Sequence, residues 1–252
     1  MSRPPADVVV EPDADRLARA VASALVARLA AAQVVHGTAS LVLTGGGIGT
    51  AVLERVAELA AEPEREVVDW TAVDCWWGDE RFVPADDGER NELGARRALL
   101  DRVGVPPERV HAMPAADAGF ATCDEAAAWY AEQLTAGGGL RRFDVLLLGM
   151  GPEGHVASIF PASPAARDER PVVGVHDCPK PPPERISLTF PTINSAEEVW
   201  LLVSGEAKAD AVAAALAGAG PLDIPAAGVH GVRATRWLLD AGAAARLPAA
   251  RT

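Results

Sequence analysis

The sequence predicts an α/β protein with a doubly wound, mostly parallel sheet and helices on both faces of that sheet. Short apolar runs alternate along the chain with Ala-rich segments whose apolar residues recur at helical spacing. One such run, Asp144–Leu148, is continuously apolar after its first residue, which is typical of a strand covered by helices on both sides. The repeated strand-helix-strand order favours parallel pairing.

The first half of the chain shows this alternation clearly. Apolar residues at positions 17, 21, 25 and 29 predict a first helix, and its Asp-rich first turn suits the helix dipole. The elements predicted for this half are strand Val8–Glu11, helix Asp13–Ala32, strand Leu41–Thr44, helix Ala51–Ala61, strand Val73–Trp77 and helix Asn91–Val103.

The second half continues the pattern around one irregular stretch. Its predicted elements are helix Asp124–Leu134, strands Phe143–Gly149, Arg185–Phe190 and Glu198–Val203, helix Ala207–Leu216 and strand Arg236–Asp240. The Pro-rich segment Ala162–Glu184 could be a domain linker, but strands of one kind on both sides favour a long surface loop bordering a site. We therefore expect a single domain over residues 1–252, with a smaller lobe as the alternative.

Composition and charge restrict the class of partner. The chain has 252 residues, a formal net charge of -12 and 49% hydrophobic residues. A nucleic-acid-binding protein needs a basic stripe, and the sequence contains none, so we expect no nucleic-acid partner. A small anionic substrate remains possible, because a few Arg, Lys and backbone N–H groups can bind it locally.

Cysteine usage and hydropathy predict a cytoplasmic protein. Cys75, Cys123 and Cys178 are odd in number and lack CxxC spacing, as expected of reduced thiols. The N-terminal residues contain no apolar core of a signal peptide, and no run approaches 18 apolar residues without a charge. We therefore expect no leader and no membrane contact. We also expect the protein to be a monomer or a weak homodimer.

Glycines follow the second predicted strand, in the stretch Thr44-Gly45-Gly46-Gly47-Ile48-Gly49-Thr50. Such a turn can present several N–H groups to an anion at a helix N-terminus. The pattern is neither a GxGxxG dinucleotide fingerprint nor a Walker A loop. A phosphate cradle and a plain tight turn are equally compatible with it.

Charged residues follow the next strand, in Trp77-Gly78-Asp79-Glu80-Arg81 and then Arg90-Asn91-Glu92. Arg81 could pair with a phosphate through its planar fork, and Asp79 or Glu80 could bind sugar hydroxyls or hold that Arg. A solvated loop with internal ion pairs is the alternative.

The strand Phe143–Gly149 runs into Met150-Gly151-Pro152-Glu153-Gly154-His155, which delivers a Glu and then a His beyond a strand end. Imidazole titrates near neutrality and can take a proton from water. Glu153 could orient the ring, and N–H groups of Gly149–Gly154 are candidate oxyanion donors. We assign no role to the other histidines, His36, His111, His176 and His230. Without HExxH or grouped Cys/His spacing, we expect no metal site.

Two further cations stand at strand ends. Lys208 lies in the first turn of a predicted helix, where the dipole disfavours a cation unless an anion is bound. A surface Lys is the alternative. Arg185, at the start of a strand, is a weaker candidate contact.

These segments resemble the 6-phosphogluconolactonase branch of the glucosamine-6-phosphate deaminase/isomerase superfamily. The resemblance rests on LVLTGGG, WWGDERFVP with RNE, FDVLLLGMGPEGHVASIFP, RISLTFPTIN and VSGEAKA, in this order over nearly the whole chain. It implies a Rossmann-like fold and cofactor-free hydrolysis of a phosphosugar lactone, 6-phospho-D-glucono-1,5-lactone, in the oxidative pentose phosphate pathway. It also implies that His155 is the catalytic base, that Thr44, Gly45, Gly46 and Gly47 form the phosphate loop, and that Arg81, Lys208 and Arg185 contact the substrate.

The chain departs from the family pattern in ways that affect function. Its loop reads TGGGIG where SGGSTP is frequent, so two side-chain hydroxyls are missing, and Glu153 stands where Asp is common. The related deaminases carry a Glu five residues after the His, where this chain has Phe160, which cannot transfer protons. The resemblance therefore favours a lactonase over a deaminase. A non-catalytic phosphosugar sensor and a nicotinamide-dependent enzyme are further alternatives, which the missing DNA-binding segment and the glycine pattern disfavour.

Overall fold

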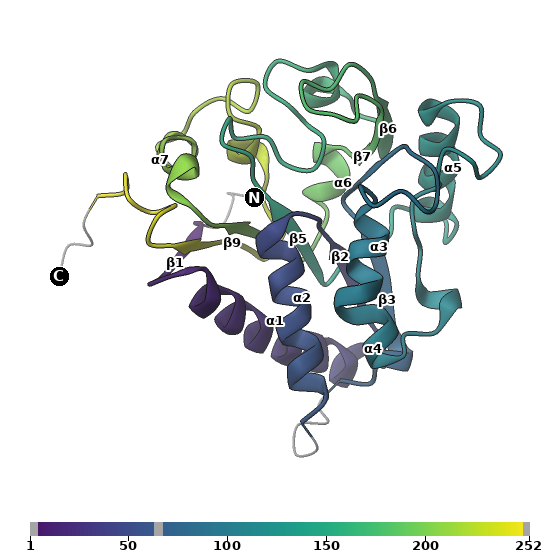
Figure 1. Cartoon of the computed structure of the whole chain (residues 1–252), viewed down its shortest axis with the longest axis horizontal. Helices are drawn as coiled ribbons and strands as arrows, with labels where there is room; N and C mark the ends of the chain where they lie inside the picture. The colour runs from purple at the N-terminus through teal and green to yellow at the C-terminus, as the bar shows by residue number, and fades with distance from the viewer. Residues whose placement is uncertain (1–4, 63–67, 249–252) are drawn as a thin grey trace.

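The main sheet has six parallel strands. The computed structural model describes residues 5–62 and 68–248. The strand order in the sheet is β1-β9-β8-β5-β2-β3 (Figure 1). Their bounds are β1 Asp7–Glu11, β9 Ala234–Asp240, β8 Glu198–Val203, β5 Val145–Gly149, β2 Ala39–Leu43 and β3 Val73–Trp77. Every pair in this sheet is parallel, which confirms the predicted fold class.

The connections of the sheet run in two opposite directions. Those through α1 (Ala14–His36) and α2 (Gly47–Ala60) run toward β3. These two helices pack side by side (Figure 1). Those through α5 (Cys123–Thr135) and α7 (Ala209–Leu216) return toward β1. Since parallel crossovers are right-handed, connections that run in opposite directions lie on opposite faces of a parallel sheet. The direction reverses between β2 and β5, so a crevice is expected beyond the carboxyl ends of these strands.

Helix boundaries differ from the predicted ones for local reasons. Gly46, at φ 84°, allows α2 to begin at Gly47, four residues earlier than predicted. Gly37, at φ 75°, ends α1. The predicted helix Asn91–Val103 is present as α3 (Asn91–Ala95), a π-helical turn (Arg96–Leu100) and α4 (Asp101–Val103).

A second sheet, antiparallel and three-stranded, was not predicted. It pairs β4 (Asp79–Arg81), β7 (Arg185–Leu188) and β6 (Val172–Val175). The strand at Arg185 is therefore real but lies outside the parallel sheet, and Phe190 begins a short helix, α6 (Phe190–Ile193). The expectation of a long loop over Ala162–Glu184 was wrong, because β6 lies within it. Strands of three or four residues, one of them fully charged, are too short to show a period in the sequence.

Helix α1 is long and apolar enough, by length and composition, to cross a membrane. Its apolar stripe is nevertheless buried, with Leu17, Val21, Leu25 and Leu29 at most 1% exposed in the same core cluster as the sheet. A core helix satisfies the same length and composition criteria, so this is weak evidence for a span. Residues 1–4 lie outside the described residues. They are part of the N-terminal segment in which we expected no leader. The single-domain organisation over residues 1–252 stays a prediction.

Tyr130 of α5 ties the helix to the end of β3 and to the segment at His111. The Trp77 N–H donates to Tyr130 Oη (3.1 Å), and this hydroxyl donates to the His111 carbonyl (3.0 Å). Tyr130→Phe leaves both buried backbone groups unpaired, so we expect a loss of about 1–3 kcal/mol in the free energy of unfolding. Denaturant titration measures it, with Trp129→Phe on the same helix as the half-exposed control. A change below about 0.5 kcal/mol would contradict the assigned role.

Candidate active site

A cleft of about 530 Å³ opens beyond the carboxyl ends of β2 and β5. This is the position expected from the reversal of the connections. With the exception of Glu153, every residue assigned to the site from sequence lines it: Thr44, Gly45, Gly46, Gly47, Asp79, Arg81, His155, Arg185 and Lys208. The structure thus brings together residues from five separate segments of the chain.

The N-terminus of α2 faces this cleft without a side-chain cap. Helices α1 and α5 are capped by Asp13 and Thr122, whereas no described side chain caps α2 at Gly46. The first N–H groups of a helix need acceptors, and an anion is the natural one at an uncapped N-terminus. Thr44 Oγ1 accepts the Gly149 N–H (3.1 Å), which joins the loop after β2 to the end of β5.

The side chain of Asn91 packs against the glycine loop that follows β2. A Cβ on Gly45 would lie 2.0 Å from Asn91 Oδ1, so only glycine fits there. Asn91 in turn donates to the Asp79 carbonyl (2.9 Å). Glu80, fully buried, accepts the N–H groups of Arg81, Asn91 and Glu92 at 2.7–2.9 Å. Burial raises the pKa of Glu80 to about 7, although Arg90 and these donors oppose the shift. Glu80 therefore supports the backbone and does not face the cleft.

His155 stands on a tight turn directly after β5. Gly151 donates its N–H to the His155 carbonyl (3.0 Å), and Gly154 at φ +85° donates to the Gly151 carbonyl (3.0 Å). A Cβ on Gly151 would lie 2.0 Å from His155 Nδ1, so the ring packs directly on the turn. Phe160 stacks on the other side, with ring centroids 4.4 Å apart. These contacts fix the imidazole at the wall of the cleft.

A carboxylate and an ammonium control the charge of this imidazole. Burial lowers the pKa of His155 below 6.5, and Lys180 lowers it further, while Glu153 and Asp79 oppose the shift. Glu153 Oε1 lies 3.2 Å from His155 Nδ1, without hydrogen-bond alignment, and 2.8 Å from Lys180 Nζ. Burial would raise the pKa of Glu153, but Lys180 and His155 hold it below its usual value. His155 is therefore neutral near pH 7, beside an ionised Glu153.

Several cationic side chains line the cleft, although the protein as a whole carries a net negative charge. Lys208 Nζ donates to the Met150 carbonyl (2.6 Å), and burial, with the nearby Lys180, lowers its pKa. Arg81 Nε is buried and finds no acceptor among the described residues. Arg185 is differently employed: it donates to the carbonyls of residues 180, 181 and 182 at 3.0–3.2 Å. Arg185 thus holds the segment that carries Lys180.

Sequence reasoning missed Lys180, Asn91 and Ser158. Lys180 was hidden in the Pro-rich segment, and only the fold brings it to Glu153, 27 residues earlier. Asn91 was quoted in a motif without a role. Ser158 Oγ donates to Asp79 Oδ2 (2.7 Å) in the interior, so Asp79 is oriented by a residue that no spacing pattern could single out.

The fold and the cleft define an α/β protein with a cation-lined pocket around a neutral histidine. A family model described as glucosamine-6-phosphate isomerases/6-phosphogluconolactonase matches residues 12–237. The chain therefore belongs to this family, and the resemblance seen in its motifs is confirmed.

Individual relatives support the lactonase side of the family. A Streptomyces coelicolor protein named 6-phosphogluconolactonase is 51% identical over 96% of this chain and 94% of its own length. A Mycobacterium tuberculosis protein of the same name is 50% identical over 96% and 98%. A solved structure described as 6-phosphogluconolactonase from Trypanosoma cruzi superposes with a TM-score of 0.82 at 26% identity, over 99% of both chains.

The ring of His155 provides a direct test of the site's electrostatics. We expect a pKa below 6.5 for His155, and a higher value in Lys180→Met, because this change removes a positive charge and leaves Glu153 to interact with the ring alone. NMR titration of the imidazole resonances measures both. Lys180→Arg, which keeps the charge, is the matched control and should preserve the low value. A pKa that does not respond to Lys180→Met would be inconsistent with this arrangement.

Proposed function

We propose that this chain hydrolyses 6-phospho-D-glucono-1,5-lactone to 6-phosphogluconate, with His155 as the base that activates water. The observation that carries the proposal is one cleft holding an uncapped helix N-terminus, Arg81, Lys208 and a neutral histidine together. The names of the relatives at about 50% identity point to the same reaction. The oxidative pentose phosphate pathway is where such a lactone is consumed.

In this mechanism His155 takes a proton from water as the water oxygen attacks the lactone carbonyl. The bond between the carbonyl carbon and the ring oxygen then breaks, and the imidazolium returns its proton to that oxygen. A base of lowered pKa suits the first step because it is unprotonated near neutrality. Glu153 contributes by stabilising the imidazolium during the reaction.

The tetrahedral oxyanion needs donors that are not already engaged. The N–H groups of Gly149, Gly151 and Gly154 donate to Thr44 Oγ1, the His155 carbonyl and the Gly151 carbonyl. Each of these three N–H groups would have to give up an existing hydrogen bond to bind the oxyanion. We therefore assign the stabilisation of the oxyanion to other hydrogen-bond donors of the cleft.

The phosphate is held, in our proposal, by the N–H groups at Gly45, Gly46 and Gly47 together with Lys208 and Arg81. An anion there completes the first turn of α2 and satisfies the buried Arg81 Nε. Asp79, held by Ser158, would accept a hydrogen bond from a sugar hydroxyl. Fixing the phosphate in this way orients the ring toward His155.

Phe160 favours hydrolysis over the ring-opening chemistry of the deaminases. Its ring stacks on His155 and offers no group that transfers protons. The proposed reaction needs no cofactor. We also propose that the enzyme works in the cytoplasm as a monomer or weak homodimer, without nucleic acid or membrane, since Cys75, Cys123 and Cys178 are free thiols and the sequence has no basic stripe.

Removing the base should reduce turnover and leave the fold intact. We expect His155→Ala to lower kcat by about 10²- to 10⁴-fold, the usual contribution of a general base. The assay supplies the lactone from a coupled dehydrogenase and follows 6-phosphogluconate formation against spontaneous hydrolysis. His36→Ala, an exposed histidine on α1, is the matched control. Near wild-type turnover in folded His155→Ala would remove His155 from the mechanism.

Removing a phosphate-binding cation should affect binding more than chemistry. Lys208→Met should raise KM roughly 10- to 100-fold, because a hydrogen bond between charged groups contributes about 1.5–3 kcal/mol. Steady-state kinetics with the same assay measure the change. Arg246→Met removes a cation that is paired with Asp210 outside the cleft, and should leave KM unchanged. A fall in kcat at constant KM would argue against substrate binding by Lys208.

A further inference from the structure

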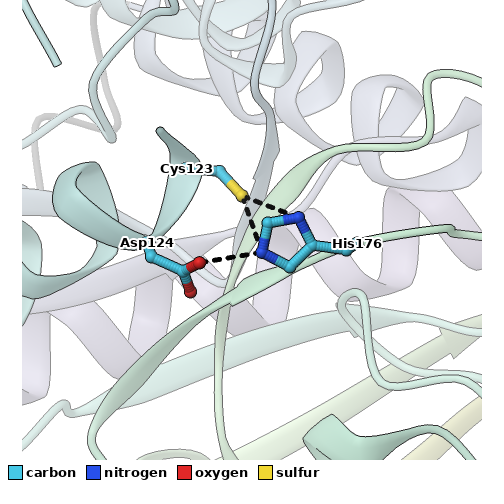
Figure 2. A group of neighbouring side chains, drawn as sticks. All are labelled: Cys123, Asp124 and His176. Carbon is cyan, nitrogen blue, oxygen red and sulfur yellow. Dashed lines mark hydrogen bonds and ion pairs between the residues drawn. The ribbon is translucent and has the colours of Figure 1, made fainter. Parts of the chain in front are cut away.

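Cys123, Asp124 and His176 form a cluster that the proposed reaction does not use (Figure 2). The first two residues begin α5, and His176 directly follows β6, 53 residues after Cys123. None of the three lines the cleft around His155. The packing of α5 against β6 brings them together, which explains why no local spacing motif announced the cluster.

The His176 ring lies beside both other side chains, and Cys123 Sγ is nearly equidistant from its two nitrogens, 3.8 Å from Nδ1 and 3.6 Å from Nε2. Nε2 lies 3.6 Å from Cys123 Sγ and 2.8 Å from Asp124 Oδ2, and one ligand atom from each residue lies within 4.8 Å of the others. Tetrahedral zinc, with bonds of about 2.3 Å to sulfur and 2.0–2.1 Å to nitrogen or oxygen, separates its ligand atoms by roughly 3.3–3.6 Å. The S–N distance already fits. The N–O distance needs to open by about half an ångström, and both side chains are about half exposed.

The surroundings of the cluster support binding of a cation. Glu184 Oε1 lies 3.5 Å from the other ring nitrogen, His176 Nδ1, the position of the carboxylate that orients many zinc-bound histidines. The Gly174 backbone packs closely on Asp124, since a Cβ on Gly174 would lie 2.6 Å from Asp124 Oδ1. Two carboxylates, and a thiol that can lose its proton to a bound metal, together favour a divalent ion.

We propose that Cys123 Sγ, Asp124 Oδ2 and His176 Nε2 bind a divalent transition metal of the zinc class. The mixture of a sulfur, a nitrogen and an oxygen ligand suits zinc better than magnesium or calcium, which take oxygen ligands only. Binding replaces the thiol proton, which passes to solvent. Cys123 is fully buried, so the same three residues do not form a nucleophile open to a substrate.

The site is structural in its effect and separate from the proposed hydrolysis. His176 begins the segment that ends at Arg185 and carries Lys180, whose ammonium contacts Glu153. A metal on His176 fixes the first residue of this segment to α5, while Arg185 fixes the last part of it. The bound metal therefore stabilises the fold around the segment without entering the cleft.

Cobalt and zinc titrations of the chelator-treated protein test this proposal. Bound Co²⁺ should give thiolate-to-cobalt charge-transfer absorption in the near ultraviolet, absent in Cys123→Ala and strongly weakened in His176→Gln. Zinc at about 100-fold above its Kd should raise Tm by roughly 5–10 °C, and the rise should disappear in Asp124→Asn, a surface change that tests the site even where Cys123→Ala fails to fold.

Two controls separate this site from other ligands. Cys178→Ser removes a thiol two residues beyond His176, and His155→Gln removes the histidine of the cleft. Both should keep the absorption band and the zinc-dependent rise in Tm. Absence of the band in the wild-type protein at saturating Co²⁺, its persistence in Cys123→Ala, or a zinc effect that depends on His155 would each overturn the proposal.

Discussion

The contact between the loops after β2 and β5 is the constraint on which the cleft depends. These neighbouring strands send their connections in opposite directions, so a crevice opens between their ends. The hydrogen bond from the Gly149 N–H to Thr44 Oγ1 holds the two ends together across that space. On one side it positions the uncapped N-terminus of α2, and on the other it anchors the turn that carries His155. The proposed anion site and the proposed base thus share one support.

Local charge, and not the charge of the whole protein, governs what this cleft can bind. The chain carries a formal charge of -12, yet Arg81, Lys180, Arg185 and Lys208 all line the cleft. Partial burial strengthens their effect on an anion, because the effective dielectric is lower there than in water. The positive charges of Lys208 and Lys180 repel each other, and this repulsion contributes to the lowered pKa of Lys208. A bound phosphate would relieve that repulsion, so substrate binding and the stability of the charged cleft are linked.

The sequence predicted the parallel sheet and most of the residues that line the cleft, because long apolar runs and strand-end glycines have local causes. It did not predict the second sheet, since β4 consists of Asp79, Glu80 and Arg81, and its strand character arises only from pairing with β7. Lys180 was missed for a similar reason. Its importance depends on a contact with Glu153 that the antiparallel sheet and Arg185 create, and no residue near Lys180 in sequence signals it. The predicted roles of Glu153 and Arg185 remain untested, but their contacts differ from those expected.

Glu153 illustrates why the balance of contacts matters more than the presence of a carboxylate. A carboxylate aligned on His155 alone would raise the pKa of the imidazole and leave it protonated near neutrality. Lys180 Nζ lies closer to Glu153 Oε1 than His155 Nδ1 does, at 2.8 Å against 3.2 Å. The ammonium therefore offsets part of the carboxylate's effect on the pKa of His155 in the resting state, and burial keeps the ring unprotonated. In the proposed mechanism the ring gains a proton from water, and the same carboxylate is already beside it. A longer Glu in place of Asp allows this shared position, because it reaches both the ring and the ammonium from one turn.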